Sequence, residues 1–181
     1  MRKLLMPLIF GLSLLYPFLI FYGLQNFKAA WLLPILFLMI LARLLMTGTS
    51  KTHRMLFLGG TLLMVVLISF SGAELGLKLY PVLISASFLI VFFSSLYSKQ
   101  SAVERIARIK EPDLPPKAVN YTRRVTQVWS LFFFINGGIA LYLAIYGSTK
   151  MWTLYNGLIS YLVMAMIFSV EFIVRQKVRQ Q

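Results

Sequence analysis

Six apolar runs separated by polar segments are the dominant pattern of this chain. They cover about residues 4–24, 30–46, 55–72, 79–97, 127–147 and 152–174. Each run is about long enough, as a helix that rises ~1.5 Å per residue, to cross a hydrocarbon core of ~30 Å. The pattern therefore predicts an all-α membrane protein with six transmembrane helices arranged as three hairpins.

The longest segment outside these runs, residues 98–126, is too short to form an independent soluble domain. We therefore expect one integral membrane domain over residues 1–181. Any function should lie in the helices, at their ends or in this loop. The first run begins like a signal peptide, but its length and the lack of an Ala-x-Ala cleavage pattern favour a retained helix.

Basic residues set the predicted orientation of the helices. If the N-terminus is cytoplasmic, all 18 lysines and arginines except Lys28, Lys78 and Lys150 fall on the cytoplasmic side. This asymmetry follows the positive-inside rule and places both the N-terminus and the C-terminus in the cytoplasm. The three remaining lysines are expected to face water in short outer turns.

The net charge of +13 could indicate nucleic-acid binding, but the basic residues flank the apolar runs. We therefore expect membrane lipids as partners, through the anionic headgroups of the inner leaflet, and no nucleic acid. The chain contains no cysteine, which excludes disulfides, thiol nucleophiles and Cys-based metal sites.

Residues 101–111 are predicted to form a short amphipathic cytoplasmic helix, because Ser101 and Glu104 have the spacing of a capping box. Apolar residues share one side of this helix: Val103, Ile106 and Ile109. Basic residues lie opposite or at the border: Arg105, Arg108 and Lys110. This pattern favours a helix lying on the inner leaflet, and the alternative is a helix that caps the bundle from inside.

Asn136, Gly137 and Gly138 form the most unusual segment within an apolar run. An unpaired amide in hydrocarbon is costly, so Asn136 should face other helices and find a partner there. The glycines would let a neighbouring backbone approach closely. The segment is interpreted either as a packing notch with an interhelical hydrogen bond or as a substrate site in a glycine-broken helix.

Glu171 and Arg43 each lie near the predicted inner end of a helix and are candidates for an interfacial ion pair. Glu171 has Arg175 and Arg123 as alternative partners, and a proton-coupling role is the sharper interpretation. Other residues near the predicted interfaces are candidates for contact with lipid headgroups: Arg105, Arg108, Lys110, Arg123, Arg124, Trp152 and Asn156.

Recognisable catalytic signatures are missing from the sequence. It contains no G-x-S-x-G elbow, no P-loop and no H-E-x-x-H motif, and it has only 5 acidic residues. His53 is the only histidine, so no second histidine can join it in a metal site. We expect no enzymatic activity, no cofactor and no metal.

A series of short motifs in the C-terminal half resembles the bacterial family called intracellular septation protein A, whose members span the inner membrane several times. In chain order the motifs are Leu114-Pro115, Trp129, Phe132-Phe133, Asn136-Gly137, Leu141-Tyr142-x-Ala144, Trp152 and Tyr155-Asn156-Gly157. The early stretch Pro17-Phe18-x-x-Phe21-Tyr22 is similar as well. The chain departs from the family in its longer N-terminal segment and more basic loop, which suggests a sister branch.

This resemblance implies a location in the inner membrane of a Gram-negative bacterium and a role in envelope maintenance, with no assigned catalytic residue. The first hypothesis is a non-enzymatic protein that supports envelope synthesis or division through contacts with lipids and with envelope-synthesis or division proteins. The alternative is a small transporter or lipid-handling protein with a site near Asn136–Gly138. The sequence leaves the oligomeric state open, a homo-oligomer included.

Overall fold

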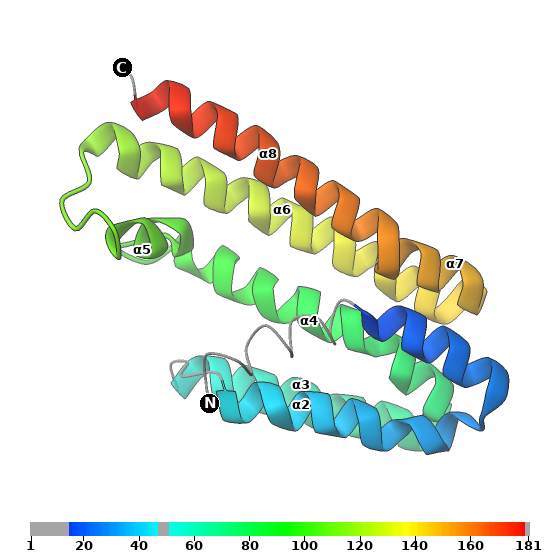
Figure 1. The fold of residues 1–181 in the computed structure, drawn as a ribbon. Helices are drawn as coiled ribbons and strands as arrows, with labels where there is room; N and C mark the ends of the chain where they lie inside the picture. The colour runs from blue at the N-terminus through cyan, green and yellow to red at the C-terminus, as the bar shows by residue number, and fades with distance from the viewer. Residues whose placement is uncertain (1–14, 47–50, 180–181) are drawn as a thin grey trace.

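A computed structural model of the chain describes residues 15–46 and 51–179, which form helices joined by turns (Figure 1). Residues 15–26 are helical, and the part of the first predicted run before residue 15 lies outside the described residues. The later elements are η1 (Ala29–Leu32), α2 (Leu33–Met46), α3 (Lys51–Ser71), α4 (Ala73–Ser95), α5 (Ala102–Arg108), α6 (Pro116–Tyr146), α7 (Thr149–Leu154), η2 (Tyr155–Ile159) and α8 (Ser160–Arg179).

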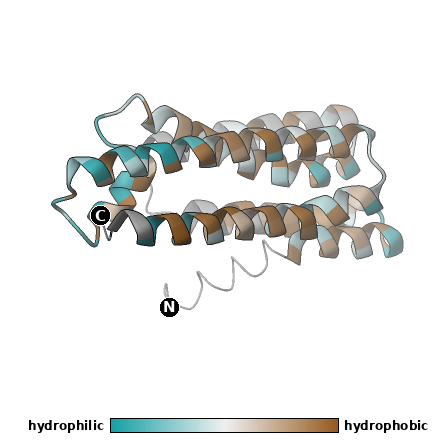
Figure 2. Ribbon diagram, turned by 90° about the horizontal axis from the view of Figure 1, so that it is seen from above, coloured by the Kyte–Doolittle hydropathy of each residue, from teal (hydrophilic) through white to brown (hydrophobic). Residues whose placement is uncertain are grey.

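Three helical segments of the described chain are long and apolar enough to cross a membrane: Ala73–Ser95, Pro116–Tyr146 and Thr149–Gln176. Figure 2 shows hydrophobic residues along the middle of the helices and hydrophilic residues gathered around α5 and the start of α6. By length and composition these are the helices of a membrane protein. The count of six spans remains a prediction.

Successive helices run in opposite directions, so the connections gather at two ends (Figure 1). One end, called here the turn end, holds the connections at residues 27–28, at Gly72 and at residues 147–148. The other, called the α5 end, holds α5, the first turns of α6 and the last turns of α8. Gly72 has a φ of 88°, a conformation that favours glycine, and this allows the sharp reversal between α3 and α4.

Two helices begin well before the predicted apolar runs. α6 starts at Pro116, where the fixed φ of proline suits the first helical position, and so includes residues 116–126, which the hydropathy pattern placed in the loop before the fifth apolar run. α4 starts at Ala73 and includes Lys78. The Lys78 ammonium lies 2.7 Å from the Glu74 carboxylate one turn earlier, which allows the lysine to be buried in the helix. The expectation that Lys78 faces water is therefore wrong.

The predicted capping box at the start of α5 is confirmed. The Glu104 backbone N–H donates to the Ser101 hydroxyl over 3.4 Å, and the Ser101 N–H donates to the Glu104 carboxylate over 3.3 Å. Val103 packs against the aromatic residues of α6, whereas Ile106 and Ile109 are 61% and 81% exposed. The apolar side of α5 is therefore partly packed against the helix bundle and partly exposed. Its contact with the inner leaflet stays a prediction.

The described residues form two buried apolar clusters. The cluster nearer the turn end includes Tyr16, Leu36, Leu77, Tyr80 and Trp152 and joins α4 to residues 15–26, α2 and α7. The cluster nearer the α5 end is formed mainly by side chains of α6: Val125, Trp129, Phe132 and Phe133. These two clusters hold α4 and α6 at the centre of the bundle.

A proline in α4 determines one contact of the first cluster. Pro81 has no N–H, so it cannot donate to the carbonyl of Leu77 four residues earlier. The hydroxyl of Tyr16 donates to this carbonyl over 2.9 Å. The hydroxyl of the neighbouring Tyr80, by contrast, is buried without a hydrogen-bond partner among the described residues.

The different surroundings of these two tyrosines predict different effects of the same substitution on stability. Tyr16→Phe should lower the free energy of unfolding by about 1 kcal/mol, because it leaves the Leu77 carbonyl unsatisfied. Tyr80→Phe should be neutral or stabilising, since it removes a buried hydroxyl that has no partner. Thermal unfolding in detergent, with the exposed Tyr142→Phe as control, measures both. Equal destabilisation by both would contradict the assignment of the Tyr16 bond.

Cysteine labelling tests the predicted topology without background, because the chain has no cysteine. Single cysteines at Lys28 and Lys150, exposed at the turn end, should react with an impermeant maleimide added to intact spheroplasts. Cysteines at Gln100 and Lys110, exposed at the α5 end, should react only after the membrane is permeabilised. Labelling of either α5-end cysteine in intact spheroplasts would overturn the predicted orientation.

Candidate functional site

Asn136 is buried in α6 and its amide is bonded on both sides. Its Nδ2 donates to the hydroxyl of Ser85 on α4 over 3.0 Å, and the Tyr155 hydroxyl of η2 donates to its Oδ1 over 3.2 Å. Ser85 is buried as well. The amide therefore joins three helical segments, an arrangement that favours the packing interpretation of this residue.

The two glycines beside Asn136 have different surroundings. A Cβ added to Gly137 would lie 3.1 Å from the Cβ of Ser85, so the missing side chain permits the close approach of α4 and α6. A Cβ added to Gly138 would meet nothing within 4 Å. Gly137 thus belongs to the packing contact, whereas Gly138 faces outward and lies outside it.

A π-helical turn over Tyr155–Ile159 interrupts the last helix and was not anticipated from the sequence. The N–H of Ser160 donates to the carbonyl of Tyr155, five residues earlier. Such turns occur often at functional sites. This turn begins at Tyr155, whose hydroxyl donates to Asn136. In the sequence, only the Asn156-Gly157 pair marked this part of the helix as unusual. In the structure, Gly157 lies so close to the Phe18 ring that an added Cβ would be 2.7 Å from it.

Trp152 and Asn156, two of the candidate headgroup contacts, are buried inside the turn end. The indole N–H of Trp152 donates to the Lys78 carbonyl over 3.0 Å, and the Asn156 amide donates to the Trp152 carbonyl over 2.9 Å. The expectation of headgroup contact is wrong for these two residues. Trp152 lies in α7 next to α4, so its ring fills the first apolar cluster instead of facing the interface.

Glu171 lies on α8 near the α5 end and contacts two residues there. Its carboxylate is 3.7 Å from the Arg175 guanidinium one turn later and accepts a hydrogen bond from the Tyr121 hydroxyl over 3.3 Å. The side chain of Arg43 lies outside the described residues, so the Glu171–Arg43 pair remains a prediction. The observed contacts tie α8 to α6 at this end.

The remaining candidate headgroup contacts are surface residues of the α5 end: Arg105, Arg108, Lys110, Arg123 and Arg124. Arg105 donates to the carbonyl of Gln100 and Arg108 to the carboxylate of Glu104, which fixes these guanidinium groups beside α5. Arg123 and Arg124 project from α6. Contact of these five residues with lipid stays a prediction.

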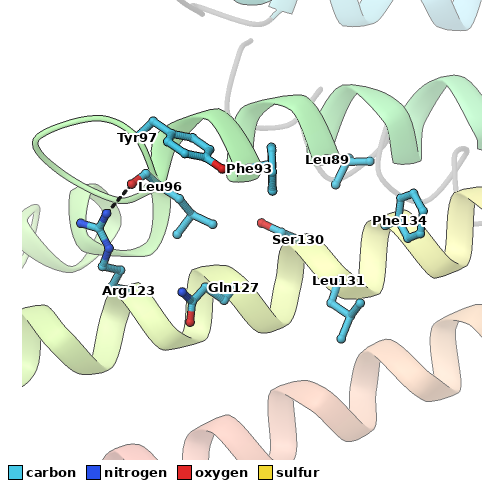
Figure 3. Close-up of a pocket in the computed structure, with 9 residues that line it drawn as sticks. All are labelled: Leu89, Phe93, Leu96, Tyr97, Arg123, Gln127, Ser130, Leu131 and Phe134. Atoms are coloured by element: carbon cyan, nitrogen blue, oxygen red, sulfur yellow. Dashed lines mark hydrogen bonds between the residues drawn. The ribbon is translucent and has the colours of Figure 1, made fainter.

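A groove of about 720 Å³ lies between α4 and α6 and was not anticipated from the sequence (Figure 3). One wall is formed by Leu89 and Phe93 of α4 and by Leu96 and Tyr97, the two residues that follow α4. The other is formed by five residues of α6: Arg123, Gln127, Ser130, Leu131 and Phe134. Arg123 donates to the Leu96 carbonyl across the end of the groove.

A second, polar cavity of about 380 Å³ adjoins the groove, because Arg123 and Gln127 line both. Its other lining residues are Asn120 and Arg124, so every lining side chain is basic or an amide. The combination of an apolar groove and a basic end can accommodate an amphipathic anion. The spacing of Arg123, Gln127 and Leu131 in the sequence places them on one side of a helix and could have indicated one wall of the groove. The opposite wall comes from another part of the chain and could not be inferred in this way.

Within the described residues, no group of three His, Cys, Asp or Glu side chains could hold a metal ion. The polar contacts of Asn136 and Glu171 join helices, and those of Arg105 and Arg108 lie at the surface of α5. The chain matches no known protein-family model, and comparisons with curated proteins and with solved structures likewise found no match.

Proposed function

We propose that the chain is a non-enzymatic protein of the bacterial inner membrane that supports envelope synthesis or division through contacts with lipids and other proteins. The observation that carries this proposal is the pairing of Asn136 with Ser85 and Tyr155. The most unusual intramembrane amide thereby serves helix association.

The surface of the bundle supports the same proposal. Exposed basic residues gather at the α5 end, where the positive-inside rule places the anionic inner leaflet. Arg123, one of these basic residues, lines one end of the groove between α4 and α6. Six spans with both termini in the cytoplasm, and kinship with the septation protein A family through a sister branch, are parts of this proposal.

A small transporter or lipid-handling protein with a site near Asn136–Gly138 is the second candidate. The π-helical turn favours it, since such turns are frequent at functional sites and this one places the Tyr155 hydroxyl beside Asn136. The two candidates differ in what Asn136 does. A variant that removes the amide therefore separates them.

Substitution of Asn136 should reduce stability and leave the remaining folded protein functional. Asn136→Leu removes both hydrogen bonds, each worth about 0.6–2 kcal/mol between membrane helices, and Ser85→Ala removes one. Gly138→Ala is the matched control, because a methyl group there meets no neighbour. Folded amount is measured by size-exclusion chromatography, and function by the ability to restore normal growth and division to a deletion strain.

Under the proposed function, complementation should follow the amount of folded protein in all three variants. A fully folded and abundant Asn136→Leu protein that does not complement would overturn the proposal and favour the transporter. Gly138→Ala with the same loss of complementation would point to a site open on that side of α6.

A further inference from the structure

We propose that the groove between α4 and α6 binds one anionic phospholipid, with an acyl chain along its apolar part and the phosphate at Arg123. This inference rests on the proposed function and deepens it, because it names the lipid class and the surface that receives it.

The α6 wall of the groove changes from polar to apolar along the helix. Arg123, Gln127, Leu131 and Phe134 follow one another in steps of three or four residues and so share one side of α6. From Arg123 to Phe134 the helix rises about 16 Å. A phospholipid has the same order of groups, with a charged phosphate at one end and hydrocarbon at the other.

The α4 wall changes in the same direction, since α4 runs antiparallel to α6 (Figure 3). Tyr97 and the Leu96 carbonyl stand opposite Arg123 at the polar end, and Phe93 and Leu89 continue the wall toward the apolar end. Both helices are long and apolar enough to cross a membrane. The apolar part of the groove therefore faces the hydrocarbon region, where an acyl chain is the available occupant.

The polar cavity supplies the groups that a phosphate needs. Arg123 and Arg124 contribute positive charge, and Asn120 and Gln127 contribute amide donors. None of the residues lining the groove or the cavity is acidic. Guanidinium groups match phosphate oxygens in geometry and charge, so this lining favours an anionic headgroup over a zwitterionic one.

Arg123 is held in place for this role before a lipid arrives. One of its Nη atoms donates to the Leu96 carbonyl at the end of α4, and a guanidinium has five N–H donors in all. The remaining donors can reach a phosphate at the mouth of the groove. An extended peptide in the same groove would bring backbone N–H and C=O groups into hydrocarbon without partners, which disfavours it.

Lipid titration of the purified full-length protein in detergent, followed by native mass spectrometry, tests the proposal. Three probes are compared: dioleoylphosphatidylglycerol, dioleoylphosphatidylcholine and glycerol 3-phosphate. The first should bind with one tight site, at least several-fold more tightly than the second, and the third should not bind measurably. Arg123→Gln should weaken phosphatidylglycerol binding about tenfold, as expected for the loss of a charged hydrogen bond.

Matched variants separate the groove from general charge and hydrophobicity. Lys117→Gln removes an exposed charge from the same helix without touching either cavity, and it should leave binding unchanged. Leu131→Trp fills the groove and should weaken binding severalfold, whereas Leu141→Trp, about three turns further along α6, should not. If Arg123→Gln fails to fold because the Leu96 contact is lost, Arg124→Gln and Leu131→Trp decide the question.

Several results would overturn the proposal. They are equal binding of the two phospholipids, binding of glycerol 3-phosphate as tight as that of phosphatidylglycerol, equal loss with Arg123→Gln and Lys117→Gln, or copurification of a peptide in the groove. These measurements concern the purified protein alone. Failure here would leave the proposed function standing, whereas failure of the Asn136 variants in cells would leave the lipid site standing.

Discussion

The fold depends on one constraint: a polar group buried within the bundle is costly unless it finds a partner inside the protein. Among the buried side chains that the structure describes, the Tyr80 hydroxyl is the exception. Pro81 leaves the Leu77 carbonyl without its helical hydrogen bond, and the Tyr16 hydroxyl donates to this carbonyl instead. Asn136 is satisfied by two residues from different helices. Each of these hydrogen bonds also fixes which helices are neighbours. The need of buried polar groups for hydrogen-bond partners therefore determines much of the helix packing.

Local features of the fold could be predicted from the sequence because they depend on residues close together in the chain. The capping box at Ser101 and Glu104 is the clearest case, since both of its bonds span three residues. Helix starts were less predictable. Lys78 marked a boundary in the hydropathy pattern, but its ion pair with Glu74 allowed α4 to continue through it. Pro116 likewise begins α6 within residues 98–126, which the pattern placed in a loop between two apolar runs.

The candidate site was predictable only in its individual residues. The cost of a buried amide was enough to predict that Asn136 has a partner, but Ser85 is 51 residues away in the chain and could not be identified. The burial of Trp152 depends in the same way on the distant carbonyl of Lys78. The groove needs walls from two helices, and a pattern within one helix describes only one wall. Long-range contacts thus account for most of what sequence reasoning missed.

The length of α6 has a mechanical consequence. Its 31 residues correspond to about 46 Å, whereas the hydrocarbon core measures only ~30 Å. The helix must therefore tilt or project beyond the core, and α5 is attached to the projecting part through the bond from Val103 to Thr126. In a thinner bilayer α6 would lean further and α5 would move with it. The bond between α5 and α6 would thus couple the tilt of α6 to the position of α5.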